Sequence, residues 1–130
     1  MSKLITGIHH IAIIASDYQK SKYFYTTILG FEIIREVYRS ARDSFKLDLQ
    51  VDIKTQIELF SFPNTPPRPS TPEACGMRHL AFKVVDLDAM IDYLQAYDVE
   101  CEPIRIDEFT GKRFTFFKDP DQLPLELYEI

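Results

Sequence analysis

The first half of the chain alternates between strand-like and helix-like hydrophobic patterns. Residues 8–15 form an apolar run rich in β-branched side chains, which is typical of a buried strand. Asp17 can cap a helix, and Gly30 is typical of the position just past a helix end. Between them, apolar spacing predicts a helix with one face made of Ser21, Phe24, Tyr25, Ile28 and Leu29. Further strands are expected over residues 31–38, 45–51 and 55–60.

The second half of the chain shows the same order of patterns. A strand is expected over residues 77–84, and Asp86 is a second candidate helix cap. The helix after it should present Leu87, Met90, Ile91, Leu94 and Tyr97 on one face. Strands should follow over residues 103–109, 112–118 and 123–130. Residues 63–72 hold five of the eight prolines and are expected to be an extended linker, because proline fits neither a central strand nor a helix interior.

The two halves are two copies of one unit. Gly7, His10, Ala12 and Asp17 recur in the same order and at the same spacing as Gly76, His79, Ala81 and Asp86. Residues 57–60 (Ile-Glu-Leu-Phe) are answered by residues 125–128 (Leu-Glu-Leu-Tyr) at a separation shorter by a single position, so one loop deletion relates the copies. We therefore predict an α+β fold in one domain, with two βαβββ modules over residues 5–62 and 76–130. Each module should form a curled mixed sheet with its helix outside.

Charge and composition exclude several classes of function. The formal net charge of −5, without a basic stripe, argues against nucleic-acid binding. The longest apolar runs, of about five residues, are far shorter than the roughly 20 needed to span a bilayer. Cys75 and Cys101 show no CxxC spacing and no signal peptide is evident, so we expect reduced thiols in a cytoplasmic protein.

Each copy of the unit carries one histidine early and one glutamate late. Glu58 and Glu126 each lie mid-strand between apolar residues and should face away from the core, where an isolated carboxylate is costly. Together with His10 and His79 they would suit one divalent transition metal: zinc, nickel, cobalt, manganese or iron. Calcium and magnesium fit less well because they avoid imidazole. Any one of these residues alone is more often structural, but the symmetry of the set favours a metal site.

The repeat also separates the adjacent histidines His9 and His10. His10 aligns with His79, whereas His9 aligns with Arg78, so His9 is expected to be structural. Several basic residues could contact an acidic substrate, although most should be solvated charges: Arg39, Arg42, Lys46, Arg105, Lys112 and Arg113. Arg113 is the strongest of these candidates, because it shares a strand face with Thr115 and Phe117.

Ordered stretches along almost the whole chain carry a resemblance to a known family. They are residues 10–13 (His-Ile-Ala-Ile) with Asp17, residues 25–31, 58–63, 68–82, 117–121 and 125–127. They resemble the vicinal oxygen chelate superfamily of glyoxalases, bleomycin-resistance proteins and extradiol dioxygenases. Within it, the chain is most similar to small bacterial glyoxalase I-like proteins of the YaeR type. Gln122 departs from the family pattern, which usually has glycine at this turn.

The resemblance implies a cup formed by the two modules around a metal held by His10, Glu58, His79 and Glu126, with zinc or nickel favoured. The implied activity is that of a lactoylglutathione lyase, which isomerises a 2-oxoaldehyde–thiol hemiacetal through an enediolate. Glu126 would be the base and Glu58 its symmetric partner, although the sequence itself does not rank the two. The implied partners are a small-molecule substrate, such as a thiol adduct, and a second copy in a homodimer, with the site within one chain or across two.

Two other classes of function compete with this interpretation. The first is another metalloenzyme of the superfamily, namely an epimerase, a dioxygenase or a thiol transferase. The dioxygenases and fosfomycin-modifying transferases use two histidines and one glutamate, so the intact Glu58 favours the isomerase and lyase branch. The second is a non-enzymatic protein that sequesters a ligand, a class that generally lacks the metal-binding set.

Overall fold

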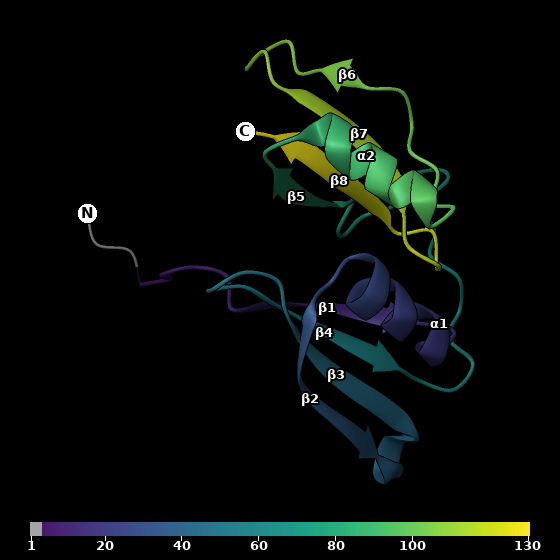
Figure 1. Cartoon of the computed structure of the whole chain (residues 1–130). Coiled ribbons are helices and arrows are strands. Elements are labelled where there is room, and N and C mark those ends of the chain that lie inside the picture. Colours follow the sequence, from purple (N-terminus) through teal and green to yellow (C-terminus); the bar gives the residue numbers. More distant parts are fainter. Residues whose placement is uncertain (1–3) are drawn as a thin grey trace. The chain divides into compact units, whose positions relative to one another are not determined.

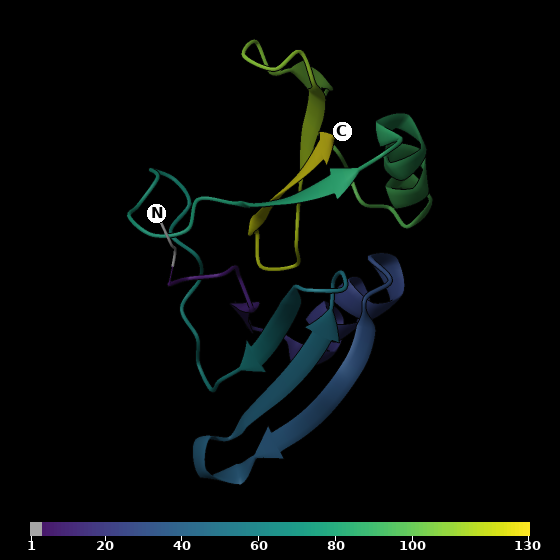
Figure 2. The ribbon, with the colours of Figure 1, turned by 90° about the vertical axis from the view of Figure 1, so that its left-hand side faces the viewer.

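The computed structural model describes residues 4–130 and divides into two compact units, one ending at Pro66 and one beginning at Pro67. Each unit consists of a four-stranded mixed sheet and its helix (Figures 1 and 2). The order along each unit is one strand, a helical segment and three strands. The predicted α+β fold of two βαβββ modules is therefore confirmed.

In the first unit, the last strand of the sequence lies next to the first strand in the sheet. Its elements are β1 (His10–Ala15), α1 (Tyr18–Tyr23), the π-helical η1 (Phe24–Ile28), β2 (Glu32–Arg39), the 3-10 turn η2 (Ser40–Arg42), β3 (Ser44–Gln50) and β4 (Gln56–Ser61). The spatial order of the strands is β1-β4-β3-β2. β4 pairs in parallel with β1 and antiparallel with β3, so the last strand of the unit lies inside the sheet.

The second unit repeats this topology. Its elements are β5 (Leu80–Val84), α2 (Leu87–Ala96), β6 (Arg105–Ile106), β7 (Arg113–Lys118) and β8 (Pro124–Glu129). The spatial order is β5-β8-β7-β6, again with the first and last strands in parallel. Ala12 lies opposite Glu58 in the first unit, and Ala81 lies opposite Glu126 in the second. The sequence repeat is thus also a repeat of strand register.

Both helices begin just after the aspartates predicted to cap them. The Asp17 carboxylate accepts a hydrogen bond from the Lys20 backbone N–H at 3.1 Å, and the Asp86 carboxylate accepts one from Ala89 at 3.0 Å. Each bond satisfies an N–H group that a helix leaves unpaired at its start. Gly30 follows η1 with a φ of +77°, which glycine adopts without a steric penalty. The two aspartates thus fix where the chain leaves β1 and β5 to begin a helix, and Gly30 marks the end of the first helical segment.

One face of each sheet is buried against its helical segment. In β4, Ile57 and Leu59 are fully buried, and in β8 Leu125 is fully buried and Leu127 nearly so. The helical segments contribute their own buried side chains: Tyr18, Ser21, Phe24, Tyr25, Ile28, Leu87 and Leu94. Burial of each isoleucine or leucine side chain among these residues contributes about 1.5–3 kcal/mol to stability. Because strand side chains alternate, the glutamate between each buried pair points to the opposite face.

The predicted strand over residues 103–109 is wrong in extent, because β6 covers only Arg105–Ile106. Asp107 ends the strand by forming a turn. Its carboxylate accepts a hydrogen bond from the Phe109 backbone N–H at 2.9 Å, and its carbonyl accepts one from Gly111 at 2.7 Å. These bonds are local, so they replace the pairing with β7 that a longer strand would make.

The strand predicted over residues 77–84 begins only at Leu80. The carbonyls of Met77 and Arg78 accept hydrogen bonds from the Arg68 guanidinium instead of from a neighbouring strand. The other predicted strands begin and end within two residues of the observed bounds. Tyr97, predicted on the buried helix face, is 38% exposed because α2 ends at Ala96.

The left-handed backbone conformation of Gln122 leads to a testable prediction. This residue has a φ of +67° in the turn between β7 and β8, a left-handed conformation that costs residues with a Cβ about 1–2 kcal/mol. Gln122→Gly should therefore raise the free energy of unfolding by about 0.5–1 kcal/mol, part of the gain being lost to the entropy of glycine in the unfolded chain. Thermal unfolding should show a midpoint increase of about 2–4 °C. Gln122→Ala keeps the Cβ and should show no such gain. A glycine variant no more stable than wild type would contradict strain at this position.

Candidate metal centre

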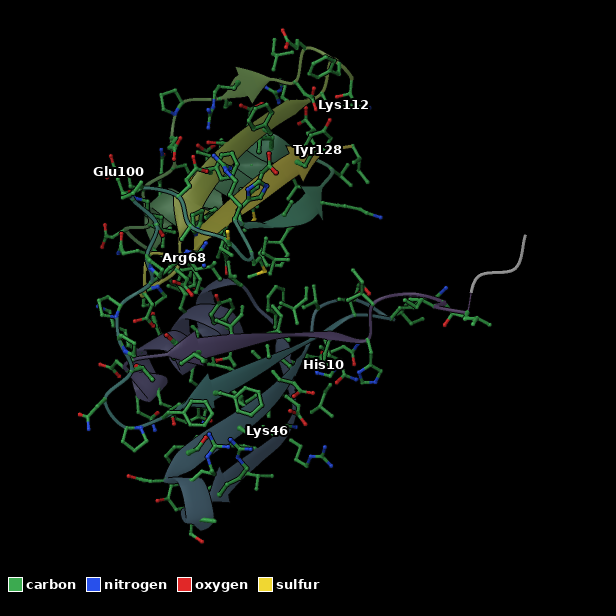
Figure 3. The ribbon with its side chains drawn as sticks, turned by 180° about the vertical axis from the view of Figure 1, so that it is seen from behind. His10, Lys46, Arg68, Glu100, Lys112 and Tyr128 are labelled. Carbon is green, nitrogen blue, oxygen red and sulfur yellow. The ribbon has the colours of Figure 1, made fainter. Side chains whose placement is uncertain are left out.

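The first unit brings His10 and Glu58 together on its exposed sheet face. His10 is the first residue of β1, two positions before Ala12, which lies opposite Glu58 on β4. Residues two apart on a strand share a face, so the imidazole of His10, labelled in Figure 3, lies on the same face of the sheet as the Glu58 carboxylate. His10 Nε2 lies 3.4 Å from Glu58 Oε2, and the Glu58 side chain is 14% exposed. A half-buried carboxylate and an accessible imidazole thus form one pair of potential metal ligands.

The second unit brings His79 and Glu126 together in the same way. His79 directly precedes β5, two positions before Ala81, which lies opposite Glu126 on β8. His79 Nε2 lies 3.2 Å from Glu126 Oε1, and the Glu126 side chain is 12% exposed. The four residues predicted from the repeat therefore form two equivalent His–Glu pairs, one in each unit.

The donor atoms in each pair have a spacing that fits a shared metal ion. Ligand atoms about 2.1 Å from one ion at tetrahedral or octahedral angles lie about 3.0–3.4 Å apart, close to both observed distances. Imidazole nitrogen with carboxylate oxygen is a donor set that suits first-row transition metals. Within neither unit do three or more His, Cys, Asp or Glu side chains among residues 4–130 form a metal-binding group. Each unit alone therefore offers two ligands.

Glu58 lies beside a polar network that the sequence did not predict. Asp48 on β3 is opposite Glu58, and the Lys46 ammonium lies 2.7 Å from Asp48 Oδ1 and 3.7 Å from Glu58 Oε1. Arg35 donates to the other Asp48 oxygen at 3.0 Å. Burial raises the pKa of Asp48, but the hydrogen bonds from Lys46 and Arg35 outweigh it and lower that pKa. The network keeps a cation beside Glu58.

Glu126 lies in aromatic surroundings instead. The residue opposite it on β7 is Phe116, at the position that Asp48 occupies in the first unit. The Phe116 ring packs edge-on against the His79 imidazole with the ring centroids 5.0 Å apart. Phe114 packs next to Phe116 in the same edge-on manner. The two pairs thus have the same geometry but different neighbours.

The second nitrogen of each imidazole also has a neighbour. His79 Nδ1 lies 3.0 Å from the Arg78 guanidinium, and His10 Nδ1 lies 3.0 Å from His9 Nδ1. Arginine only donates, so His79 Nδ1 accepts in its contact with Arg78, whereas a histidine that binds a metal through Nε2 donates from Nδ1; metal binding by His79 therefore requires Nδ1 to exchange Arg78 for an acceptor. His9, expected to have only a structural role, is therefore in direct contact with the His10 ring, and its place next to His10 in the sequence was the available signal.

A cavity of about 1110 Å³ adjoins Glu126 in the second unit. Phe114 and Phe116 of β7, Arg105 of β6 and Arg68 of the segment before β5 contribute to its wall. The cavity therefore combines one proposed ligand with an aromatic surface and positive charge, features typical of a site for a small polar molecule.

The sequence matches the model of the Glyoxalase/Bleomycin resistance protein/Dioxygenase superfamily over residues 7–127. The chain belongs to this superfamily. The match covers both His–Glu pairs and confirms the resemblance seen in the sequence.

Close relatives within the superfamily are small bacterial proteins. The chain is 63% identical to the uncharacterized protein YaeR of Escherichia coli (strain K12), covering 94% of this chain and 95% of YaeR. It is 60% identical to the uncharacterized protein YwkD of Bacillus subtilis (strain 168), covering 97% and 98%. A solved glyoxalase family protein from Enterococcus faecalis is 50% identical, with a TM-score of 0.92 and coverage of 98% and 100%.

More distant similarities reach proteins with stated activities. A 2-epi-5-epi-valiolone epimerase from Actinomyces sp. is 27% identical over 95% of this chain and 79% of its own length. The trypanothione-dependent glyoxalase I of Leishmania major and the antibiotic-binding protein TnmS3 of Streptomyces sp. CB03234 share the fold at TM-scores of 0.73 and 0.75. Each is only 23% identical to this chain, so they support the superfamily fold alone.

Arg113 does not belong to the candidate site, contrary to the expectation that singled it out. Its guanidinium donates to Glu129 at 2.9 Å and to Asp88 at 2.8 Å, and the Glu129 carboxylate also accepts from the Leu87 backbone N–H. Arg113 thus connects β7 and β8 to the start of α2, on the helix side of the sheet.

The helices of the chain can also be compared with the length of a membrane span. Among residues 4–130, no helix has the length and apolar content needed to cross a membrane.

The Arg113 cluster predicts a pH-dependent contribution to stability. The hydrogen bonds from Arg113 lower the pKa of Glu129 from 4.5 to about 2. The folded state binds this proton less tightly than the unfolded state, so the contribution is complete above about pH 4.5 and is lost as the pH falls toward 2. Arg113→Met should lower the urea midpoint at pH 6, and the difference from wild type should shrink in acid. Arg42→Met is the control for charge removal and should show no such pH dependence. A difference that stays constant between pH 6 and pH 2.5 would contradict the linkage.

Proposed function

We propose that the chain is a metal-dependent lyase or isomerase of the glyoxalase I type. The observation that carries this proposal is the repeated His–Glu pair, with donor atoms 3.4 Å apart in one unit and 3.2 Å apart in the other. The ligands of one divalent transition metal are then His10, Glu58, His79 and Glu126. Zinc and nickel are the favoured ions, with cobalt, manganese and iron as alternatives.

Two considerations support joining the pairs into one site. Each pair alone supplies only two donors, whereas metal sites that perform chemistry usually have at least three protein ligands. His10, Glu58, His79 and Glu126 would hold the ion, and four protein donors would leave room for substrate oxygens on a six-coordinate metal. Members of the superfamily also commonly use a divalent metal.

The substrate proposed is the hemiacetal of a 2-oxoaldehyde and a thiol. A bound divalent ion supplies Lewis-acid stabilisation of the negative charge that develops on the two vicinal oxygens of the substrate. The carboxylate at the site performs the proton transfer: it removes the proton from C1 and returns it to C2. The hydroxyl proton moves from the C1 oxygen to the C2 oxygen, and a 2-hydroxyacyl thioester results.

Glu126 is the glutamate proposed as the base. Lys46 Nζ lies 3.7 Å from Glu58 Oε1, and this contact holds the Glu58 side chain in place, which suits a permanent ligand. Glu126 has the Phe116 ring opposite it and contributes to the wall of the cavity, where a substrate carbon can reach the carboxylate. A general base needs such access to the carbon that loses the proton.

An epimerase is the second candidate, favoured by the similarity to the Actinomyces enzyme. Epimerisation next to a carbonyl uses the same proton abstraction and return, and two glutamates at symmetric positions suit attack from two faces. A ligand-sequestering role has only the fold shared with TnmS3 in its favour. The paired donors argue against it, because a sequestering protein has no need of them.

Metal content tests the ligand assignment. Protein purified without chelator or added metal should hold about one transition metal ion per chain, measured by inorganic mass spectrometry. Glu58→Gln and Glu126→Gln should each weaken metal binding at least tenfold, because each removes a charged ligand. Glu108→Gln, at an exposed turn position, is the matched control and should keep the wild-type content. A wild type that fails to bind added zinc or nickel would refute the metal site, and full occupancy in both variants would refute the ligands.

Turnover tests the reaction and the choice of base. The metal-loaded protein should convert methylglyoxal with glutathione, or with another thiol in a panel, to the thioester followed by its absorbance. Glu126→Gln measured at saturating metal should lower kcat about 10²–10⁴-fold, the usual contribution of a general base. Glu58→Gln under the same conditions should lose less. Equal losses in both variants would contradict the assignment of Glu126, and no turnover by metal-loaded protein with any thiol would favour the epimerase.

A further inference from the structure

The cavity next to Glu126 is cationic in a chain that is acidic overall. The chain has a formal net charge of −5, yet four basic side chains contribute to the cavity wall: Arg68, Arg78, Arg105 and Lys118. The acidic side chains of the wall are Glu73, Glu102 and Glu126. If Glu126 is a metal ligand, the rest of the wall carries an excess of positive charge, which favours an anionic occupant.

Two of the arginines already serve the structure of the segment before β5. Arg68 donates to the Ser70 hydroxyl at 2.9 Å and to the Arg78 carbonyl at 3.0 Å. Arg78 donates to the Glu73 carboxylate and lies against the His79 ring. These hydrogen bonds shape the wall of the cavity, and they occupy more of the N–H donors of Arg68 and Arg78 than the single polar contact of Arg105 does.

Arg105 is different, because its guanidinium rests on an aromatic surface and keeps its hydrogen-bonding capacity. The β6–β7 register places Arg105 opposite Phe114, and its Cζ lies 5.2 Å from the centre of the Phe114 ring and 5.3 Å from that of Phe116. Among residues 4–130, its one polar partner is Glu102, at 3.1 Å from one terminal nitrogen. A guanidinium has five N–H donors, so most of them remain for a ligand.

The contact with Glu102 does not prevent ligand binding by Arg105. Both side chains of this ion pair are about half exposed, and ion pairs of this kind contribute little to stability. An incoming carboxylate or phosphate offers the guanidinium two oxygens in a planar, bidentate arrangement, which is the stronger interaction. Cation–π contacts with the two rings hold the guanidinium in place for that contact.

The distances to the Phe116 ring limit how far apart Arg105 and His79 lie. Its centre lies 5.3 Å from the Arg105 guanidinium carbon and 5.0 Å from the centre of the His79 imidazole, so both groups border the same phenyl ring. A small molecule is therefore long enough to contact both groups.

We propose that Arg105 binds the carboxylate or phosphate of a small anionic substrate whose opposite end is the pair of vicinal oxygens activated beside His79 and Glu126. The activated end rests on the function proposed above. Arg105 is thus a specificity-determining residue. It selects oxygen chelators whose negative group is separated from the chelating atoms by a short spacer, since both binding groups contact the same phenyl ring.

This substrate class can be tested with a series of 2-hydroxy acids, whose affinities for the zinc-loaded protein are measured by calorimetry. Ligands with one chelating head and three different ends are compared: 2-hydroxyglutarate, its distal amide, and 2-hydroxy-4-phosphonobutyrate. Ligands with a distal anion should bind about tenfold more tightly than the neutral amide. This is the contribution expected from a charged hydrogen bond to Arg105 that is weakened by partial exposure to solvent. The carboxylate and phosphonate arms identify which oxyanion the site prefers.

Substitutions of Arg105 should remove the preference for the distal anion. Arg105→Gln should bind all three ligands alike, and Arg105→Lys should keep part of the difference because it keeps the charge but not the planar fork. Arg42→Gln is the matched control, since Arg42 also lies over a phenyl ring, Phe62, at 4.9 Å. Its ligand preference should be that of wild type. Wild type without any preference for the distal anion would overturn the proposal.

A metal-free experiment separates this inference from the proposed function. Inorganic phosphate and propionate are titrated into chelator-treated protein and followed by amide NMR shifts. Shifts that Arg105→Gln abolishes would support the anion site even if zinc did not bind. Zinc binding combined with equal affinity for the amide and the anions would overturn the anion site and leave the metal proposal intact.

Discussion

The candidate site depends on one constraint, the parallel pairing of the first and last strands of each unit. β1 pairs with β4, and β5 pairs with β8, in the same register. The glutamate on the last strand lies between two core residues, so it must point to the face away from the helix. The parallel neighbour then supplies the histidine, two residues before an alanine whose small side chain leaves room beside the carboxylate. A one-residue slip of either strand would move its ligand to the core side.

Within that common frame the two units have diverged in chemistry. The position opposite the glutamate is Asp48 in one unit and Phe116 in the other. Two residues earlier, the corresponding positions are Lys46 and Phe114. One glutamate is thus held beside a charged network, and the other adjoins an aromatic cavity; under the proposed function the first suits a fixed ligand and the second a base. Duplication provides a symmetric donor set, and divergence at two neighbouring positions provides a chemical difference between its halves.

The sequence predicted the architecture and the paired residues because both leave local or repeated signals. The caps at Asp17 and Asp86 and the alternation around each glutamate are local, and the repeat distinguished His10 from His9. The Lys46–Asp48 network and the Arg105 platform were missed because they depend on which residues lie opposite each other across strands. Arg113 was misjudged for a related reason: its strand face was visible in the sequence, but which face carries the helix was not. The short β6 was missed because Asp107 forms a turn with its own neighbours.

The central claim is that the two His–Glu pairs bind one metal ion together, and X-ray absorption at the metal edge tests it most directly. Zinc-loaded protein should show four or more nitrogen and oxygen neighbours at about 2.0–2.2 Å, with multiple scattering from two imidazoles per ion. His10→Ala and His79→Ala should each reduce this to one imidazole. A spectrum with a single imidazole per zinc in the wild type would contradict the account, because each unit would then bind its own ion or only one unit would bind metal.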